Sequence, residues 1–531
     1  MTDTNLVSLW PYEPPGMRHL GVIDLGSNTT RLVIYGYVPG RAFRIEDAIR
    51  APVRLSEGMA DTGVLRARPI QRAIDALRLF RQHADAYNLT ELIFVATAAT
   101  RDAVNGEEFL ARLRAETGLD PRILSGEEEA YYGYVAAVNS LPFSDGLVVD
   151  IGGGSVEVAR VAGRHMGQAS SLPFGAVRVT ERYLHTDPVK KGELNTLLRE
   201  ARDALKQVRH VSGGGAMVGM GGTVRALAKM DRALNPSPID DLHGYVLPKA
   251  SIDRLIDQLR DLPVVRRSSL PGLSSDRADV ILGGAVVLQT VMDLGGFSAC
   301  TVSNQGIREG LFYERFLTGG GPPTTPDNPP LLDDIRAFGV HNLVQLYGGN
   351  IDHFARVREL ALSLFDQLTP LHGYGEFERD LLSAAAWLHD VGVVVDYWEH
   401  HRHSAYIILN APLPGWSHPE LALIALLARN HRKGSISLGG LSGALEGGDA
   451  ERVEKLSALL RLAEYLERGK TGVITGVNVH VGPGWVQVEA ATRGDAGVEI
   501  WEANRNTDLF QRAYGREMEV MAVASPTPTA P

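Results

Sequence analysis

The sequence predicts an α/β protein built from two related lobes, followed by a helical domain and a small segment that contains strands. Strand patterns alternate with helical ones from about residue 20 to about residue 318, which favours an α/β architecture. One strand–turn–strand segment occurs twice, and an internal repeat of this kind implies a duplicated lobe. Beyond residue 330 the apolar residues recur almost wholly at helical spacing.

A chain of 531 residues should divide into about three or four domains. Its formal net charge of -10 disfavours a general nucleic-acid or anionic membrane surface. The single cysteine, Cys300, excludes internal disulfides and suits a reducing compartment. The first residues lack an apolar signal segment, and no uncharged apolar run reaches the ~18 residues that span a bilayer. We therefore expect a cytoplasmic protein with neither a nucleic-acid nor a membrane partner.

The first glycine turn lies in residues 22–32, which read VIDLGSNTTRL. An apolar run ends in Asp24, small residues follow, and a strand pattern resumes, as expected for two strands joined by a tight turn. Backbone N–H groups of such a turn can converge on phosphate oxygens, and a carboxylate beside it can hold Mg²⁺. Asp24 is the candidate metal ligand, and the candidate phosphate ligands are Gly26, Ser27, Asn28 and Thr29.

Arg101 and the acids after Ser125 each have two interpretations. Arg101 follows the strand predicted at 92–96, where α/β sheets bind ligands, so it is either a phosphate clamp or a solvated arginine at a helix start. Residues 125–131 read SGEEEAY, which is typical of a helix N-terminus that Ser125 caps. One of these carboxylates could also serve as a general base toward a water beside a bound phosphate.

Residues 147–157 repeat the first turn in the second lobe and read LVVDIGGGSVE. Aligned on Asp24 and Asp150, the two segments share an apolar run, an aspartate and small residues before the next strand. Asp150 and Glu157 are candidate Mg²⁺ ligands. The candidate phosphate ligands are Gly152, Gly153, Gly154 and Ser155. Two lobes that face each other across a cleft would present both turns to one phosphate chain.

A third glycine cluster opens a helix, and helix N-termini bind phosphate. Its candidate phosphate ligands are Gly221, Gly222 and Thr223. The cluster does not match the dinucleotide-binding pattern GxGxxG, because Val224 stands where the last glycine belongs.

The Pro- and Gly-rich residues 319–330 can continue neither a helix nor a strand, so we expect the main linker there. The remaining pattern predicts a flexible lead-in at 1–17, lobes at 18–140 and 141–318, and a helical domain at 331–469. A small α+β domain with an antiparallel sheet should follow at 470–522, with a disordered tail at 523–531.

The helical domain is rich in histidine. Histidines that project from several helices into a bundle can bind a metal, whereas single surface histidines are the usual alternative. The residues concerned are His353, the pair His389 and Asp390, His400, His401, His403 and His431.

Seven segments between about residues 20 and 470 together resemble the exopolyphosphatase and guanosine pentaphosphate phosphohydrolase (Ppx/GppA) family. They are residues 22–32, 97–101, 125–130, 149–157, 219–223, 303–310 and 401–407. The resemblance implies two ribonuclease-H-like lobes of the actin, sugar-kinase and heat-shock-70 superfamily, followed by an HD-like helical domain. It also implies a homodimer.

The resemblance further implies roles for single residues. Glu129, directly before the alanine of SGEEEA, matches the general base of the family, and Arg101 matches its arginine for the terminal phosphate. Asp150 and Glu157 match its Mg²⁺ positions. Potassium is implied as a further, stimulating ion.

Two positions depart from what the resemblance implies. Val156 stands where many members have threonine, and Glu464 stands where HD phosphohydrolases use a late aspartate as their last metal ligand. His353, His389 and Asp390 resemble the earlier ligands of such a site, so a second metal in this domain is left open. The alternative is that the domain extends a substrate channel, with an anion facing Arg402, His403, His431, Arg432 and Lys433.

We therefore expect a Mg²⁺-dependent exopolyphosphatase that releases orthophosphate from the end of inorganic polyphosphate. Hydrolysis of the 5′-terminal phosphate of guanosine pentaphosphate would use the same machinery and is the main alternative. A non-catalytic sensor of polyphosphate or nucleotide is an alternative of another class, and a kinase of the same superfamily is a fourth. The glycine turns alone do not separate hydrolysis from transfer, whereas the Glu129 motif favours water as the acceptor.

Overall fold

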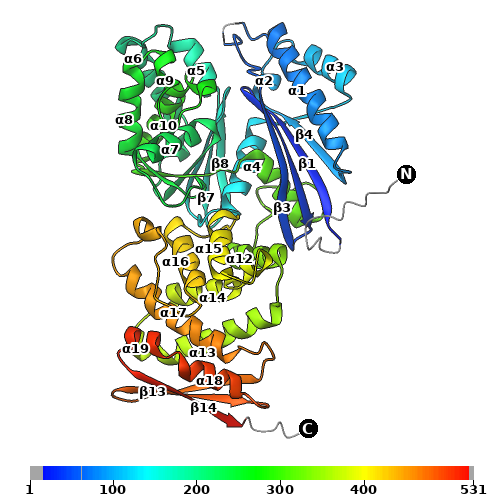
Figure 1. The fold of residues 1–531 in the computed structure, drawn as a ribbon. Helices are drawn as coiled ribbons and strands as arrows, with labels where there is room; N and C mark the ends of the chain where they lie inside the picture. The colour runs from blue at the N-terminus through cyan, green and yellow to red at the C-terminus, as the bar shows by residue number, and fades with distance from the viewer. Residues whose placement is uncertain (1–15, 61, 525–531) are drawn as a thin grey trace, which may run out of the picture. The chain divides into compact units, whose positions relative to one another are not determined.

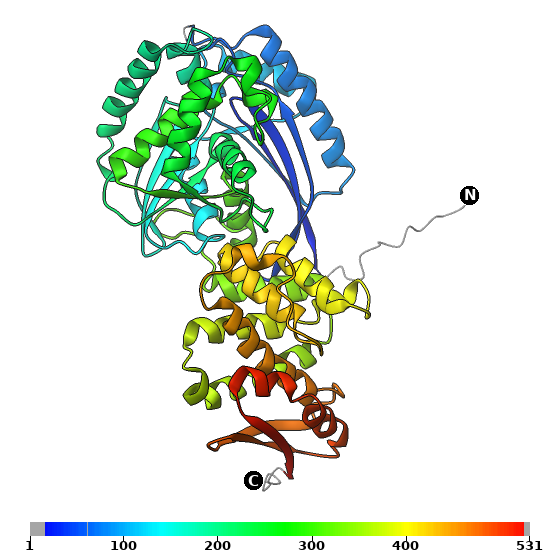
Figure 2. The same ribbon diagram turned by 60° about the vertical axis from the view of Figure 1, so that its left-hand side comes forward.

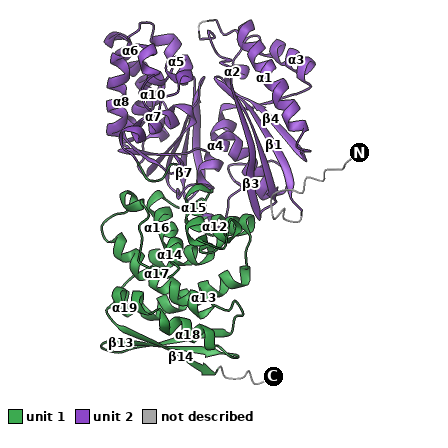
Figure 3. Ribbon diagram, viewed as in Figure 1, with its two compact units in different colours: residues 1–13, 237–240, 336–531 green, residues 14–236, 241–335 purple. Residues whose placement is uncertain are grey.

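The computed structural model describes residues 16–60 and 62–524, and it divides into two compact units. The α/β unit comprises residues 14–236 and 241–335, and the helical unit comprises residues 237–240 and 336–531 together with 1–13 (Figure 3). The predicted lead-in and tail lie almost wholly outside the described residues.

The α/β unit contains the two lobes that the repeat predicted. The strands of the first lobe are β1 (Arg18–Leu25), β2 (Thr29–Val38), β3 (Ala42–Pro52), β4 (Glu91–Ala96) and β5 (Arg122–Ile123). Those of the second lobe are β6 (Gly146–Ile151), β7 (Val156–Ala162), β8 (His165–Leu172), β9 (Ala216–Met220), β10 (Val246–Pro248) and β11 (Ala299–Val302).

The two sheets have the same strand order. The first runs β3-β2-β1-β4-β5, and the second runs β8-β7-β6-β9-β11 with β10 added at its edge. In both sheets the first three strands in sequence pair antiparallel, and the next two run parallel to the first. This common topology confirms the duplicated lobe and the α/β class.

Helices cover these sheets and meet between them. The first lobe contributes α1 (Ala67–Asp85), α2 (Ala98–Arg101), α3 (Gly106–Thr117) and α4 (Gly126–Val138). The second contributes α5 (Ala176–Tyr183), α6 (Lys191–Lys206), α7 (Gly221–Leu234), α8 (Lys249–Asp261), α9 (Val264–Arg267), α10 (Ile281–Gly295) and α11 (Ile307–Thr318). Helices α4 and α11 pack on each other, α4 also on β7 and β8 and α11 also on β1, so the lobes join along this helix pair (Figure 1).

Each lobe has its own hydrophobic core. Strands β1 and β6 are buried along almost their whole length, as their continuous apolar runs predict for strands covered on both faces. In both views α1 lies beside the first sheet, and α3 packs on α1 (Figure 1, Figure 2). The rigid strands thus hold the two glycine turns at the ends of neighbouring sheets.

Strand β3 is the main element that the sequence pattern missed. It carries Arg44, Glu46 and Asp47 among half-exposed positions and forms the edge of the first sheet. Charged side chains on an edge strand discourage further strand pairing, but they also remove the apolar alternation that marks a strand.

The predicted linker is an ordered strap on the α/β unit. The Asn139 side chain at the end of α4 donates to the carbonyl of Pro330 and accepts from the N–H of Leu332, both at 2.8 Å. Thr324 bonds Glu314 of α11 through its hydroxyl and its N–H. Proline and glycine do exclude regular structure here, yet polar contacts fix the segment.

The helical unit consists of α12 (Ile335–Tyr347), α13 (Ile351–His372), α14 (Glu376–Leu388), α15 (His400–Asn410), α16 (His418–Arg429), α17 (Asp449–Leu466), α18 (Gly497–Arg505) and α19 (Asp508–Tyr514) with β12 (Ile474–Val481), β13 (Trp485–Thr492) and β14 (Glu517–Ala524). Its three strands share one core with the helices, through Ile474, Val486, Val488 and Val520. The sheet is not wholly antiparallel as predicted, because β13 and β14 run parallel. Helices α18 and α19, between these two strands, provide the crossover that parallel pairing needs. Among the described residues, no helix is both long and apolar enough to cross a membrane.

Cys300 of β11 should be chemically inert in the folded protein. It is fully buried, and burial raises the pKa of its thiol to about 12, so the reactive thiolate is scarce at neutral pH. We expect a thiol reagent to label the native protein negligibly at pH 8 and to label it once after denaturation. The variant Ser268→Cys, at an exposed position, is the positive control. Rapid native labelling of Cys300 would show that β11 is not packed as described.

Candidate active site

Both predicted glycine turns line one cavity of about 120 Å³ in the α/β unit. Each turn is closed by the same hydrogen bond, from the first glycine N–H to the carbonyl three residues on, at 3.2 Å for Gly26 and 3.1 Å for Gly152. A Cβ atom on Gly153 would lie 3.0 Å from the Cβ of Ser27, and one on Gly154 would lie 2.8 Å from the Ser27 hydroxyl. Because Gly153 and Gly154 lack a Cβ, the backbone of the second turn can approach the Ser27 side chain of the first turn at the cavity. Gly26, Ser27, Asn28, Thr29, Gly152, Gly153, Gly154 and Ser155 all line it.

The third glycine cluster lies in the same cavity only in part. Gly221 and Gly222, at the first turn of α7, line it, whereas Thr223 does not. Gly221 has φ +90°, and a Cβ there would lie 2.6 Å from Oδ1 of Asp150, so the position requires glycine. Thr223 is buried against Gly284 of α10 instead. A helix N-terminus thus opens into the cavity, but the predicted threonine ligand supports packing.

Four carboxylates line the cavity, contributed by β1, α4, β6 and β7: Asp24, Glu129, Asp150 and Glu157. Burial and the neighbouring Asp24 carboxylate together raise the pKa of Asp150 to about 6, against the lowering effect of the Arg225 guanidinium. Burial, together with the charges of Glu129 and Asp150, holds the pKa of Glu157 well above its usual range. Burial also raises the pKa of Asp24, although Arg308 donates to its Oδ2 at 3.0 Å.

This donor set fits a divalent cation. Carboxylate oxygens are the ligands that hard cations such as Mg²⁺ prefer. The raised pKa values come first from the burial of these carboxyl groups and then from their mutual repulsion, and a bound cation would offset both.

Glu129 is positioned by the start of helix α4. The Ser125 hydroxyl accepts from the N–H of Glu128, and the Glu128 side chain accepts from the N–H of Ser125, so the expected cap forms as a reciprocal capping box. The box occupies Glu128 and directs the next residue inward, where Glu129 is only 4 % exposed. Burial raises the pKa of Glu129 to about 7, and the charges of Asp24 and Asp150 add to this effect against the opposing Arg101.

Arg101 lies behind Glu129 rather than on the cavity wall. Its guanidinium forms an ion pair with the Glu129 carboxylate, donates to the carbonyl of Leu124 at 2.8 Å and lies 3.3 Å from Asp102. In this arrangement Arg101 orients the carboxylate. Contact between Arg101 and a phosphate, as the sequence suggested, stays a prediction.

Four arginines line the cavity that were not singled out from the sequence: Arg31, Arg225, Arg277 and Arg308. Burial and the charge of Arg308 together lower the pKa of Arg31 to about 9 and that of Arg225 to about 10. Burial and the charge of Arg50 lower the pKa of Arg277 to about 10. Burial also acts to lower the pKa of Arg308, but the negative charges of Glu309 and Asp24 outweigh burial, so the pKa of Arg308 is raised. Crowded guanidinium groups of this kind suit a polyanion.

Signals for three of these arginines exist in the sequence. Arg31 and Arg308 fall within the segments 22–32 and 303–310 that carried the family resemblance, and Arg225 follows the third glycine cluster. Arg277 has no local signal, because it reaches the cavity from a loop before α10 and packs against Gly222.

The residues proposed for the helical unit fall into two groups. Arg402 and His403 lie on α15 and Lys433 follows α16; Arg402 is exposed and lies 2.8 Å from Glu399. Their contact with an anion stays a prediction. His431 differs, because it is 1 % exposed and its Nε2 lies 3.1 Å from that of His400, inside a cluster that also holds His353, His389 and Asp390.

Comparison with known proteins agrees with this site. The family model described as "Ppx/GppA phosphatase family" matches residues 33–318, and "Ppx/GppA phosphatase, domain III" matches residues 335–485. The solved Ppx/GppA family member from Aquifex aeolicus is 29% identical, with a TM-score of 0.50 over 58% of this chain and 100% of its own. An exopolyphosphatase from Cytophaga hutchinsonii is 26% identical, with a TM-score of 0.52 over 56% of this chain and 98% of its own. The chain therefore belongs to the Ppx/GppA phosphatase family and is a hydrolytic enzyme that acts on phosphoanhydrides.

Proposed function

We propose that this protein is an exopolyphosphatase that uses Mg²⁺ to hydrolyse the terminal phosphoanhydride of inorganic polyphosphate and releases orthophosphate. The observation that carries the proposal is the position of Glu129. Its buried carboxylate opens into the same cavity as both glycine turns and the four arginines. A base, a phosphate cradle and a cationic wall are thus together in one place.

The chemistry asks the protein mainly to position water and to offset charge on the phosphoryl oxygens. Glu129 would orient the attacking water and accept its proton, which is the role of a general base. Backbone N–H groups of the two turns, with Arg31 and Arg225, would stabilise the charge that develops on the transferred group. Each well-placed donor commonly contributes ~2.7–4 kcal/mol to the transition state.

Arg101 would keep the base in place. A carboxylate with a pKa near 7 needs a partner that fixes its geometry without abolishing its basicity, and the Arg101 ion pair supplies this. Because Arg101 contacts Oε1 of Glu129, Oε2 would be the oxygen that faces the water.

Asp24, Asp150 and Glu157 would hold the Mg²⁺, with Glu129 left for the water. The ion would neutralise phosphate oxygens and anchor the chain end between the two lobes. Asp24 would exchange part of its ion pair with Arg308 for the metal, which leaves Arg308 available to the phosphate chain.

Polyphosphate is favoured over guanosine pentaphosphate by the composition of the wall. No aromatic side chain is present among the described residues that line the cavity, so a guanine base finds no aromatic stacking partner there. The glycine N–H groups and the arginines can bind successive phosphates, and the carboxylates can hold the accompanying Mg²⁺, whereas none of these groups is specific for a nucleoside.

The substrate can be decided by one comparison. With Mg²⁺ present, we expect kcat/KM for phosphate release from long-chain polyphosphate to exceed that from guanosine pentaphosphate by at least about tenfold, a difference of 1.4 kcal/mol. Removal of Mg²⁺ with a chelator should abolish both activities, and its return should restore them. A higher kcat/KM on guanosine pentaphosphate would overturn the preference.

Replacement of the base should abolish turnover and spare binding. General base catalysis contributes ~10²–10⁴-fold, so Glu129→Gln should lower kcat on polyphosphate by that factor. Polyphosphate affinity measured by equilibrium binding should change little. The matched control is Glu127→Gln, two residues earlier on the exposed side of the same helical turn. If Glu129→Gln kept wild-type kcat, another residue would have to be the base.

A side chain on the second glycine turn should damage the phosphate cradle. In Gly154→Ala the new Cβ lies 2.8 Å from the Ser27 hydroxyl and 3.2 Å from Ala98, so the buried Ser27 side chain or the turns themselves must shift. We expect KM for polyphosphate to rise at least about tenfold, which corresponds to 1.4 kcal/mol. Gly192→Ala on α6, whose Cβ meets nothing within 4 Å, is the control and should keep the wild-type KM. An unchanged KM in Gly154→Ala would place phosphate elsewhere.

A further inference from the structure

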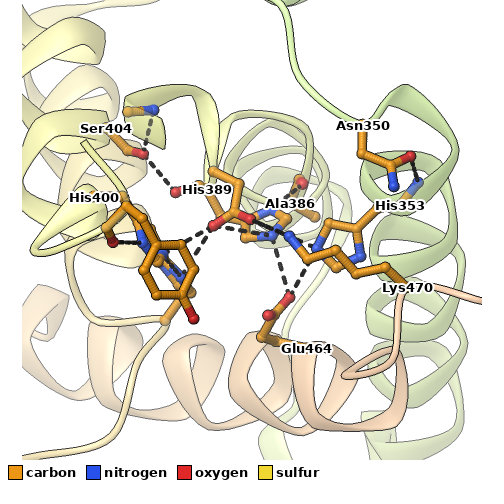
Figure 4. A network of polar contacts seen from close by, with 12 residues as sticks. Asn350, His353, Ala386, His389, His400, Ser404, Glu464 and Lys470 are labelled. Carbon is orange, nitrogen blue, oxygen red and sulfur yellow. Dashed lines mark hydrogen bonds and ion pairs between the residues drawn. The ribbon is translucent and has the colours of Figure 1, made fainter. Parts of the chain in front are cut away.

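A second cluster of ligand-type side chains lies inside the helical unit, apart from the phosphate cavity. It is assembled from the starts or ends of helices α13, α14, α15, α16 and α17, and almost every member is fully enclosed (Figure 4). Its members are His353, His389, Asp390, His400, His431 and Glu464. The family resemblance pointed to His353, His389 and Asp390 and to the position of Glu464, and the histidine-rich pattern included His400 and His431; the structure brings all six together.

Asp390 stands between two halves of this cluster. Its Oδ1 lies 3.0 Å from Nε2 of His400 and 3.5 Å from Nε2 of His431. Its Oδ2 lies 3.7 Å from Nε2 of His353. On that second side, Oε2 of Glu464 lies 3.2 Å from Nε2 of His353 and 3.3 Å from Nε2 of His389. Nε2 of His389 lies 3.8 Å from Oδ1 of Asp390, so this one carboxylate lies between both groups of donors.

Three imidazole rings are held with the same nitrogen facing inward. Nδ1 of His389, His400 and His431 each approaches, at 2.7 Å, the carbonyl three residues earlier in the chain. A carbonyl can only accept, so Nδ1 carries the hydrogen and the neutral ring turns the Nε2 lone pair into the cluster. A hydrogen bond from the outer nitrogen orients metal-binding histidines in the same way.

Hydrogen bonding within the cluster does not satisfy these inward atoms. Nε2 of His400 and Nε2 of His431 face each other at 3.1 Å, and two lone pairs repel at that separation. Other short contacts lack the geometry of a hydrogen bond. The described buried atoms without a hydrogen-bond partner include both ring nitrogens of His353, Nε2 of His389, Oδ1 of Asp390 and Oε2 of Glu464. Buried polar atoms cost free energy unless something pairs with them.

We propose that this cluster binds two divalent first-row transition-metal ions, bridged by the carboxylate of Asp390. His353, His389 and Glu464 complete the first position, and His400 with His431 completes the second. Two donors that bind one ion at ~2.1 Å lie about 3.0–3.4 Å apart. The separations around the second position are 3.0 to 3.5 Å, and those around the first are 3.2 and 3.3 Å to Glu464 and 3.7 Å between Asp390 and His353. Four imidazoles with two carboxylates suit Zn²⁺ or Fe²⁺ rather than Mg²⁺ or Ca²⁺, which prefer oxygen donors alone.

Glu464 reaches the cluster although its side chain is longer than the aspartate that HD phosphohydrolases use at this position. It projects from α17 toward His353 and His389, and its Oε2 is within 3.3 Å of both rings (Figure 4). Lys470, after the end of α17, donates to Oδ2 of Asp390 at 3.0 Å and is the more exposed member of that pair. Lys470 therefore marks the side on which the site reaches solvent. A metal ion bound to Oδ2 of Asp390 would displace Lys470, whose side chain would then turn toward solvent.

Metal content of the purified full chain tests the proposal directly. The protein is stripped with a chelator, reloaded with Zn²⁺, desalted and analysed by elemental mass spectrometry. We expect two zinc ions per chain in the wild type and one in each of His353→Ala and His431→Ala. Asp390→Ala removes the bridge and should retain fewer than about one tenth as many. His480→Ala, an exposed histidine of β12, is the matched control and should retain both.

Folding is checked alongside, so that loss of metal is not mistaken for loss of structure. Without zinc, the circular dichroism spectrum and the thermal melt of each variant should match those of the stripped wild type. If Asp390→Ala fails this test, Asp390→Asn takes its place. Zinc should raise the Tm of the wild type and not that of the Asp390 variant, because a ligand stabilises only the state that binds it. A wild type that retains no zinc overturns the proposal. A single ion lost equally from His353→Ala and His431→Ala overturns the two-ion assignment.

Discussion

The burial of like charges in one cavity is the constraint on which the α/β unit depends. Four carboxylates and four guanidinium groups line a cavity of about 120 Å³. The pKa values of Asp150 and Glu157 are raised and those of Arg31 and Arg225 are lowered, so in each case the neutral form is favoured. Such a cavity is expensive to maintain unless opposite charge enters it. The strands β1 and β6, with continuous apolar cores behind them, provide the rigid frame that keeps these charges together. A metal-bound polyanion satisfies both signs at once.

The same frame separates the tasks of binding and hydrolysis. The glycine turns and arginines come from strand ends and helix starts of both lobes, whereas Glu129 comes from one helix, α4. Glu128 is engaged in the capping box with Ser125, and the next residue, Glu129, faces the cavity. Helix α4 also packs on α11 and on the second sheet, so the position of Glu129, the proposed base, is fixed relative to both lobes. The distance between Glu129 and the glycine turns is therefore set by packing and not by a mobile loop.

Local patterns made much of this predictable, and long-range contacts account for the rest. The strands around Asp24 and Asp150, the cap at Ser125 and the repeat of the lobes all follow from short stretches of sequence. Arg277 did not, because only tertiary packing brings its loop to Gly222. Strand β3 was missed because edge pairing tolerates charge. In the helical unit, His400, His431 and Glu464 come together with Asp390 from three helices, which no local spacing encodes.

The core shared by the C-terminal strands and the helices has a consequence for synthesis. Val520 of β14 closes a cluster whose first member in the chain is Ile239, between α7 and β10, so about 280 residues separate the first and last members of one core. Non-local contacts of this length slow folding, since chain entropy must be lost before the contacts form. The α/β unit has its own cores and can fold as the chain emerges from the ribosome. The helical unit must wait with an open apolar face until β14 has been made, which makes this interval its period of greatest exposure to aggregation.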